Sequence, residues 1–423
     1  MTTLTRPPTL LWLIGLDHES GMRHGGNLRW FNLSRELLAR GGKVYFGMNR
    51  GQESDLAARR RYLDELQRDG FISGHFVLDY HYPRWRGRVA ALFGGHPRLL
   101  NRLLRAARTG ATQAIEDLVR RHQVEVILVS DRSFLFLTES LGRRTPVLVD
   151  WVDSFVLYHR RAVARHFRRG EVRAGLAALR NLVTYSLQER YYGARAAANL
   201  VASPVDKRCL DELTRMPERT HSLLNGLSIS PPVEPSAKLP MRLIFTGNMN
   251  FPPNHEAAVW FIDEVLPLIH RSRPEVVFTV AGRNPLPALI GRAGPSVQIL
   301  GDVPDISTEI AASALYVAPL VSGGGFKNKV IEAISCGTFV VSTARGVEFL
   351  DSVLSELLLV ADSPSAFAEH VVRFLQDPKP FEARLPTLQA RIGSEYTWGH
   401  RAEQLIAWLP ACRLRPQKPS GLR

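Results

Sequence analysis

The feature that most constrains the fold is an alternation of short apolar runs with longer amphipathic stretches, which occurs twice along the chain. The first series predicts strands at Thr9–Leu16, Lys43–Met48, Gly74–Leu78, Val124–Ser130, Pro146–Val149 and Asn199–Ser203. The second series predicts strands at Arg242–Thr246, Val276–Ala281, Val297–Leu300, Leu315–Pro319, Thr338–Ser342 and Leu357–Val360. This alternation is typical of α/β folds with parallel sheets.

Helices are expected between the strands, most clearly over Asn27–Arg40, Asn254–His270 and Lys327–Cys336. The segment 229–240 reads ISPPVEPSAKLP and contains four prolines, which predicts an extended linker. We therefore expect an N-terminal domain over residues 1–228 and a C-terminal domain over 241–395, both doubly wound. Ligands of such sheets bind outside the carboxyl ends of the strands, so a cleft between the domains is the expected site.

The 54 basic and 40 acidic residues give a net charge of +14 that lies entirely in the first half of the chain. Residues 1–240 contain 37 Lys and Arg against 23 Asp and Glu, whereas residues 241–423 contain 17 of each. A half-molecule of this charge attracts nucleic acid, an anionic membrane surface or phosphorylated substrates.

Two Arg-rich segments, 84–108 and 160–192, mix their charges with aromatic and aliphatic residues. They are read either as solvated faces or as surfaces that dock on anionic lipid. No nucleic acid is expected as a partner, because no RNP-like, helix-turn-helix or zinc-finger motif is found. The basic tail at 413–423 is expected to be disordered.

The cellular compartment is predicted from three features of the sequence. The cysteines, Cys209, Cys336 and Cys412, are far apart, which is typical of a reducing compartment. The N-terminus does not resemble a signal peptide, and no run approaches the roughly 18 apolar residues of a membrane span. We expect a cytoplasmic protein, with peripheral attachment to the inner face of the cell membrane as an open alternative.

The most specific local pattern is SGGGFKNKVIEA, residues 322–333, which follows a predicted strand and opens a helix. Glycines 323–325 allow backbone amides to approach an anion, and the helix start adds free N–H groups. Lys327 and Lys329 follow directly, and Glu332 lies one turn after Lys329. Phosphates suit the lysines and hydroxyls suit the carboxylate, so the pattern favours a sugar-nucleotide diphosphate. The alternative is a Gly-rich turn followed by a surface Lys–Glu pair.

Other candidate residues carry weaker signals. His18 and His24 lie in the first strand-to-helix loop, where acceptor contact, proton transfer or no direct role are open alternatives. Asp150 and Asp153 follow a predicted strand, and local capping is as plausible there as acceptor binding. Asn248 and Arg283 end strands that face the predicted cleft, where donor contact is plausible.

Residues 241–350 resemble the donor-binding domain of GT-B glycosyltransferases of family 4. The matching segments are FTGNMNFPPNHEAAVWFIDEVLPLI (245–269), VAGRNP (280–285), LGDVPDI (300–306), APLVSGGGFKNKVIEAISCGTFVVST (318–343) and RGVEFL (345–350). The similarity is greatest to sugar transferases of the PEP-CTERM exopolysaccharide system. A weaker resemblance covers HGGNLRWFNLSRELLARG (24–41), DWVDS (150–154), ASPVDKRCL (202–210) and LLNGL (223–227).

The resemblance implies a GT-B fold of two Rossmann-like domains, with a last helix at 396–412 that crosses back to the first domain. It implies that Glu332 binds the donor ribose and that Lys327, Lys329 and the loop amides of Gly323, Gly324 and Gly325 bind the diphosphate. Gly25 and Gly26 approach the same phosphate from the N-terminal domain. Family 4 enzymes often carry a Glu-x7-Glu motif; Glu332 is its second member here, and Gly324 occupies the first position.

The resemblance also implies transfer with retained configuration, with no metal and no cofactor, and no DxD triplet is present to chelate a cation. The predicted function is transfer of a hexose from a nucleoside-diphosphate sugar to a glycan or lipid-linked acceptor in exopolysaccharide synthesis. The alternatives are a GT-B-like sugar-nucleotide epimerase and a non-catalytic polyanion-binding protein.

Overall fold

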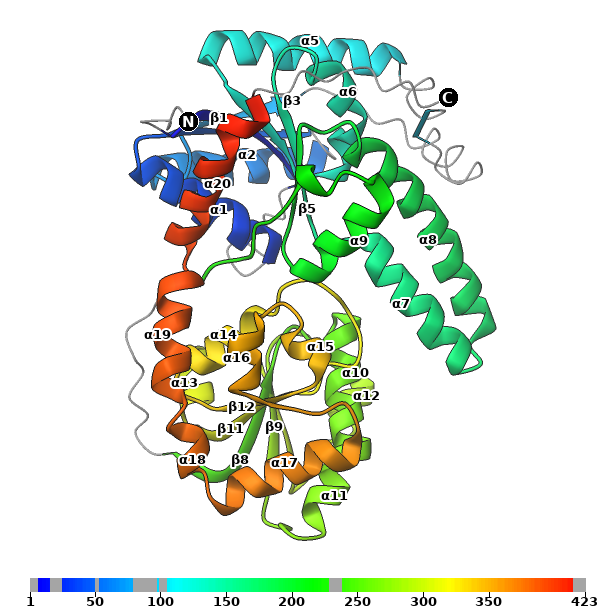
Figure 1. The fold of residues 1–423 in the computed structure, drawn as a ribbon, viewed down its shortest axis with the longest axis vertical. Coiled ribbons are helices and arrows are strands. Elements are labelled where there is room, and N and C mark those ends of the chain that lie inside the picture. Colours follow the sequence, from blue (N-terminus) through cyan, green and yellow to red (C-terminus); the bar gives the residue numbers. More distant parts are fainter. Residues whose placement is uncertain are drawn as a thin grey trace. The chain divides into compact units, whose positions relative to one another are not determined.

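The computed structural model describes residues 7–15, 25–49, 53–78, 97–98, 105–227 and 238–413. The chain divides into two compact units, and each unit has a parallel sheet of its own (Figure 1). The first unit contains the chain up to Gly226 and again from Trp398 onward. The second unit is Leu227–Thr397.

The sheet of the first unit has seven strands in the order β3-β2-β1-β4-β5-β6-β7, and all neighbours are parallel. Central strands such as β1 are buried at every position, as expected for a parallel sheet covered by helices on both faces. The strands are β1 (Thr9–Ile14), β2 (Lys43–Asn49), β3 (Gly74–Leu78), β4 (Val126–Val129), β5 (Val147–Val152), β6 (Ala198–Val201) and β7 (Thr220–Ser222).

The helices of the first unit include one that comes from the end of the described chain. They are α1 (Gly25–Ala39), α2 (Glu53–Arg68), α5 (Arg105–His122), the 3₁₀ turn η2 (Arg132–Leu137), α6 (Thr138–Leu141), α7 (Phe155–Arg168), α8 (Val172–Gly193), α9 (Pro204–Thr214), η3 (Pro217–Arg219) and α20 (Trp398–Arg413). Helix α20 packs on α1: Trp398, Leu405 and Leu409 are buried in the same core cluster as Trp30. At the surface, Arg40 Nη2 donates to Glu403 Oε1 at 3.1 Å.

The sheet of the second unit has six parallel strands in the order β10-β9-β8-β11-β12-β13. They are β8 (Leu239–Thr246), β9 (Val277–Ala281), β10 (Val297–Gly301), β11 (Ser313–Ala318), β12 (Val340–Ser342) and β13 (Leu359–Val360). The helical segments are α10 (Pro252–Trp260), the π turn η4 (Phe261–Val265), α11 (Leu266–His270), α12 (Pro287–Ile290), α13 (Ile306–Ala311), α14 (Asn328–Ser335), α15 (Ala344–Val347), α16 (Ser352–Glu356), α17 (Pro364–Gln376), α18 (Lys379–Glu382) and α19 (Leu385–Glu395).

Several helices begin at serine caps that the sequence supplies. The hydroxyls of Ser154, Ser203 and Ser363 accept a backbone N–H from the third residue of α7, α9 and α17. Such caps satisfy amides that have no partner inside the helix. No described helix is both long enough and apolar enough to span a lipid bilayer.

The α/β class and the two doubly wound sheets expected from the sequence are confirmed. One further strand, β7, was not expected, because its three residues form no apolar run. The expected helix over Asn254–His270 is α10 and α11 joined by the π turn. The last two residues of the predicted linker belong instead to β8, and residues 228–237 lie outside the described part of the chain.

Candidate functional site

The centre of the second sheet contains a topological switch point. The strand order runs outward from β8 to β9 and β10 on one side and from β11 to β12 and β13 on the other. The connections that leave the carboxyl ends of β8 and β11 therefore diverge, and ligands of doubly wound sheets bind at such points. The loop after β11 leads directly into α14, so the SGGGFKNK segment lies at this edge of the sheet.

The glycine loop adopts backbone conformations that require glycine. Gly323 and Gly325 have φ values of +92° and +72°, in the left-handed region that side chains disfavour. A Cβ at Gly323 would also lie 3.1 Å from the Pro253 ring of α10. Gly323 therefore permits the loop to lie close to α10, and both glycines permit its left-handed backbone conformation.

Lys327 forms hydrogen bonds with the backbone of this loop. Its side chain is 8% exposed, and its Nζ donates to the carbonyl oxygens of Gly324 and of Gly325, the latter at 3.0 Å. Two of its three N–H donors are thereby directed at the backbone. In this structure Lys327 shapes the loop through its carbonyl groups.

Lys329 lies beneath the loop, among the ends of the central strands. Its Nζ donates to Thr246 O at 2.7 Å and to Asn254 Oδ1 at 2.6 Å, and it lies 4.4 Å from the centre of the Phe245 ring. The side chain keeps some contact with solvent, yet protein atoms surround the ammonium closely. This burial lowers the pKa of Lys329 to about 7; the Glu332 charge opposes the lowering, and the weaker effect of the Lys327 charge adds to it. One N–H donor is left for a ligand.

Glu332 lies one turn further along α14 and is also only partly exposed. Burial raises the pKa of its carboxyl group above the usual range, and the Lys329 charge opposes that rise. Within the part of the chain that the structure describes, its carboxylate forms no hydrogen bond and no ion pair. A largely buried acceptor without a protein partner is costly unless a ligand supplies the donor.

Two further glycines, which the sequence analysis did not single out, allow the backbones behind Lys329 to approach each other. Gly247 and Gly282 follow β8 and β9 directly, with φ values of +152° and +136°. A Cβ at Gly282 would lie 2.0 Å from Gly247 O, and one at Gly247 would lie 2.8 Å from Lys329 Nζ. Glycine directly after a predicted strand, as in TGN and AGR, is the signal that could have identified them.

Asn248 and Arg283 lie at the same edge of the sheet, as expected. Asn248 is exposed, and its carbonyl oxygen accepts a hydrogen bond from Asn254 Nδ2 at 2.9 Å. Arg283 is partly exposed, and its carbonyl oxygen accepts from the Met249 N–H at 2.8 Å. Because Asn254 also binds Lys329, Asn248 belongs to the same hydrogen-bonded group as the buried lysine.

The expected residues of the first unit are not all described. His18 and His24 lie outside the described residues, whereas Gly25 and Gly26 form the first turn of α1. Asp153 follows β5 and is partly exposed.

Asp150 is completely buried and forms a bidentate pair with Arg29 of α1, each bond 2.9 Å long. Arg29 Nη1 also donates to Leu223 O at 2.8 Å and to Asn225 Oδ1 at 3.0 Å. Asp150 therefore forms an internal ion pair with a distant helix, which is not the local cap that the sequence suggested, and acceptor contact stays a prediction.

A second buried polar network, which the sequence did not indicate, lies at the carboxyl ends of β4 and β5. Glu189 of α8 is fully buried and accepts from Ser154 Oγ at 2.7 Å and from Arg132 Nη2 at 3.2 Å. The Arg132 guanidinium carbon lies 3.8 Å from the centre of the Phe155 ring, and burial lowers the pKa of this arginine. Val152 beside it has a φ of +60°, a strained value for a β-branched residue.

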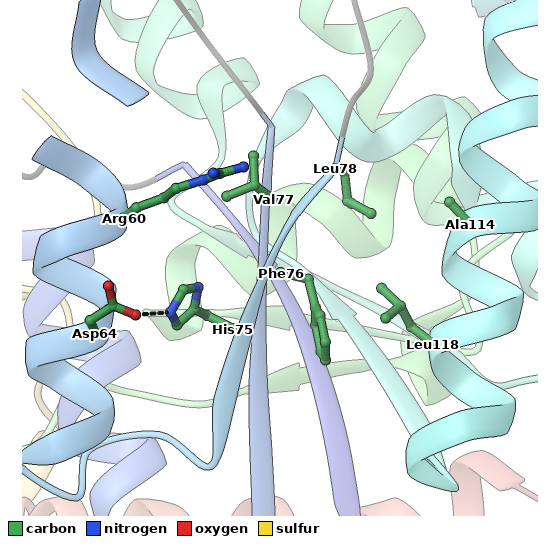
Figure 2. Close-up of a pocket in the computed structure, with 8 residues that line it drawn as sticks. All are labelled: Arg60, Asp64, His75, Phe76, Val77, Leu78, Ala114 and Leu118. Carbon is green, nitrogen blue, oxygen red and sulfur yellow. Dashed lines mark hydrogen bonds and ion pairs between the residues drawn. The ribbon is translucent and has the colours of Figure 1, made fainter. Parts of the chain in front are cut away.

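An open pocket of about 490 Å³ lies elsewhere in the first unit, at the edge strand β3. Figure 2 shows side chains from α2, β3 and α5 around it, with His75 Nε2 bonded to Asp64 at 2.8 Å. None of the expected site residues lines this pocket. No group of three potential metal ligands was found among the described residues, and the expected independence of metal remains a prediction.

Comparison with known proteins places these features in a family context. Residues 240–377, which include the glycine loop, Lys327, Lys329 and Glu332, match the family model described as glycosyl transferases group 1. A Klebsiella pneumoniae protein, described as an uncharacterized 44.6 kDa protein in the cps region, is 25% identical over 141 residues. That match covers 31% of this chain and 36% of the relative.

Solved structures resemble the chain over almost its whole length. Anabaena HepE in complex with UDP and glucose is 14% identical, with a TM-score of 0.64 over 96% of this chain and 100% of that one. Sucrose-phosphate synthase from Thermosynechococcus elongatus is 15% identical, with a TM-score of 0.63 over 94% of this chain and 97% of that one. The lipopolysaccharide outer core galactosyltransferase WaaB is 12% identical, with a TM-score of 0.60 over 95% of this chain and 99% of that one. The chain therefore has the GT-B fold, built from two Rossmann-like units, and its residues 240–377 match the group 1 glycosyl transferases.

Proposed function

We propose that the protein is a glycosyltransferase that moves a hexose from a nucleoside-diphosphate sugar to a glycan or lipid-linked acceptor. The observation that carries this proposal is the pair formed by Lys329 and Glu332 on α14, at the switch point of the second sheet. One group is a cation that protein atoms closely surround and that has a free donor, and the other is a carboxylate without a protein partner.

The diphosphate of the donor would bind between the glycine loop and Lys329. Amides of the loop and of the first turn of α14 offer N–H groups to the phosphate oxygens. The third N–H of Lys329 completes this set, and Lys327 keeps the loop in shape. Charge-assisted bonds of this kind each contribute about 1.5–3 kcal/mol.

Glu332 would accept hydrogen bonds from the two ribose hydroxyls. Its raised pKa indicates that the empty site is a poor environment for a charged carboxylate. Two hydroxyl donors would improve this environment, which favours a nucleotide over inorganic diphosphate. Asn248 and Arg283, at the same strand ends, are proposed as further contacts to the donor.

Catalysis would depend on the departing diphosphate. When the bond between the anomeric carbon and the diphosphate oxygen breaks, negative charge develops on that oxygen, next to Lys329 and the loop amides. These N–H groups are already in position, so they stabilise the charge that develops in the transition state more than the charge of the intact sugar nucleotide. We propose that transfer needs no metal, because these groups supply the positive charge. Retention of the anomeric configuration is proposed from the resemblance to family 4 enzymes.

The acceptor is proposed to belong to cell-surface polysaccharide synthesis, as in the exopolysaccharide-associated members of family 4. The K. pneumoniae relative is a protein of the cps region, and WaaB is a galactosyltransferase of the lipopolysaccharide outer core. A lipid-linked acceptor would bring the enzyme to the cytoplasmic face of the membrane. The basic excess of residues 1–240 suits such an anionic surface.

A thermal-shift screen with a panel of nucleoside-diphosphate sugars tests the donor site. A ligand at 100 times its dissociation constant stabilises the folded state by about 2.7 kcal/mol. We expect at least one donor to raise the melting temperature of the wild type and of Glu264→Ala, an exposed control in the same unit. We expect no such rise for Glu332→Ala. An equal response of Glu332→Ala would refute the ribose assignment.

The donor found in this way then tests the reaction, with membrane lipid extract as the source of acceptor. Transfer of labelled sugar to lipid or glycan supports the proposal. Conversion of the donor to an epimeric nucleotide sugar without any acceptor would identify an epimerase instead.

A further inference from the structure

Among the described residues of the first unit, the exposed large apolar side chains lie on α7 and α8, which run side by side in Figure 1 and extend beyond the sheet of that unit. Four of them on α8 are 56%, 55%, 41% and 50% exposed: Val172, Leu176, Leu179 and Val183. Their spacings of four, three and four residues place them on one face of the helix. We call these four residues the α8 stripe.

The stripe faces outward because small residues occupy the face that packs against the protein. Gly175 and Ala178 of α8 are buried, and a Cβ at Gly175 would lie 3.0 Å from the Phe167 ring of α7. The close packing of α7 on α8 therefore uses the small residues and leaves the large apolar ones uncovered. An exposed apolar surface of this kind marks an interaction site.

The charge around the stripe is strongly positive. Residues 155–188 contain seven arginines and one acidic residue, Glu171, whose carboxylate is bonded to His166 at 2.5 Å. Arg173 and Arg180 are exposed, lie seven residues apart and border one side of the stripe. Arg168 is exposed at the end of α7. Among the described residues, none of these three arginines forms an ion pair.

We propose that the α8 stripe and the arginines beside it form a docking surface for an anionic lipid bilayer. The phosphates of the headgroups would bind the guanidinium groups, while the four apolar side chains enter the boundary with the acyl chains. A nucleic acid would satisfy only the arginines and leave the stripe in water. A second copy of this helix pair would bring like charge against like charge.

Binding of the full-length protein to vesicles tests this surface. We expect tight binding to vesicles with 30% phosphatidylglycerol in phosphatidylcholine, and weak binding to pure phosphatidylcholine. Neutralising three arginines in Arg168→Gln/Arg173→Gln/Arg180→Gln should weaken binding by about 100-fold, since each contributes about 1 kcal/mol near an anionic surface. Leu176→Ser/Leu179→Ser should weaken it by about tenfold or more.

Matched variants separate the surface from general effects of charge and polarity. Ile290→Ser/Val353→Ser changes two apolar residues of the second unit that are both 51% exposed. Arg61→Gln/Arg68→Gln/Arg121→Gln removes the same charge from exposed arginines of the first unit outside the helix pair. Both controls should bind anionic vesicles within about threefold of the wild type, because these positions lie outside the docking surface.

Three outcomes would overturn the inference. In the first, the wild type does not bind anionic vesicles, or the stripe variant binds as well as its control. In the second, the stripe variant binds normally but converts a dimer to a monomer in sedimentation, which would assign the stripe to a second copy. In the third, RNA displaces the protein from anionic vesicles equally well for the wild type and for the stripe variant, which would indicate that the surface binds polyanions through charge alone.

The inference extends the membrane part of the proposed function, but the two can fail separately. The vesicle assay contains no sugar donor, and none of the changed residues belongs to the donor site. A failed thermal-shift screen would therefore leave the vesicle result unaffected.

Discussion

The lowered pKa of Lys329 predicts that binding of the sugar donor is coupled to uptake of a proton. In the protein alone this lysine has a pKa of about 7, because protein atoms replace water around its ammonium group. A bound diphosphate places negative charge beside the ammonium and so raises its pKa again. Donor affinity is therefore almost constant well below pH 7, begins to fall as the pH approaches 7, and falls about tenfold per pH unit well above it.

The magnitude follows from the protonated fraction of the empty site. With a pKa of about 7, that fraction is about three quarters at pH 6.5 and about 3% at pH 8.5. If only the charged form binds the diphosphate, the dissociation constant rises about 25-fold between these two pH values. Binding then takes up about 0.2 proton at pH 6.5 and about one proton at pH 8.5.

Isothermal titration calorimetry in buffers of different ionisation enthalpy measures this uptake directly. The ligand is the nucleoside-diphosphate sugar that gives the largest thermal shift. Both of its phosphates are esterified, so neither has the second ionisation near pH 6 of a terminal phosphate. Lys329→Gln is the control, and we expect weak binding at every pH and no proton uptake.

The reasoning is refuted if the wild type binds with the same affinity at pH 6.5 and 8.5 and takes up no proton. Weaker binding at high pH that persists unchanged in Lys329→Gln would assign the titration to another group.

Three further experiments test the packing and the electrostatics of the two units. Gly282→Ala should lower the free energy of unfolding by about 3 kcal/mol or more, because its Cβ would meet Gly247 O. Gly393→Ala, where a Cβ would lie in open space on α19, should raise the free energy of unfolding by about 0.5–1 kcal/mol. Arg29→Ala should lower the free energy of unfolding in urea by about 3–5 kcal/mol, because it leaves the buried Asp150 carboxylate without its partner. Arg40→Ala, at the surface, should lower it by less than about 1 kcal/mol. Glu332→Gln should raise the melting temperature by about 2 °C and lose the donor-induced shift, because a neutral amide suits the empty site better. Equal costs within the glycine or the arginine pair, or a lower melting temperature for Glu332→Gln, would contradict these assignments.

The sequence was sufficient to predict the strands because a buried parallel strand is a continuous apolar run. All twelve predicted strands correspond to strands of the structure, with ends that differ by a few residues. The strand β7 has no such run, since Thr220, His221 and Ser222 are polar; it pairs with β6 at the end of the first sheet. Its formation depends on a neighbouring strand and leaves no local signal.

The donor site could be predicted as a position in the sheet but not as a set of contacts. Gly323 and Gly325 have the left-handed conformations that a glycine run permits. The direction of the Lys327 side chain was not predictable. Its acceptors are carbonyl groups of its own loop, and their positions depend on the backbone conformation of that loop. Asn254 is 75 residues from Lys329 in the chain, so no spacing rule connects the two.

The pair of Arg29 and Asp150 shows the same limit in the first unit. A carboxylate at the end of a predicted strand is equally compatible with a ligand contact and with an internal ion pair. Only the fold brings an arginine 121 residues away into bidentate contact with it. The Arg-rich pattern of 160–192 likewise predicted amphipathic character, but Gly175 decides which face of α8 is covered.

The return of α20 to the first unit has a consequence for the order in which the protein is made. Side chains of Trp398, Ala402, Leu405 and Leu409 are 0–4% exposed in a core whose other members precede Gly226. A ribosome must therefore release the entire second unit before the first can close its core. The second unit, whose residues are contiguous, is free to fold earlier, and a fragment that stops at residue 226 leaves part of α1 in water.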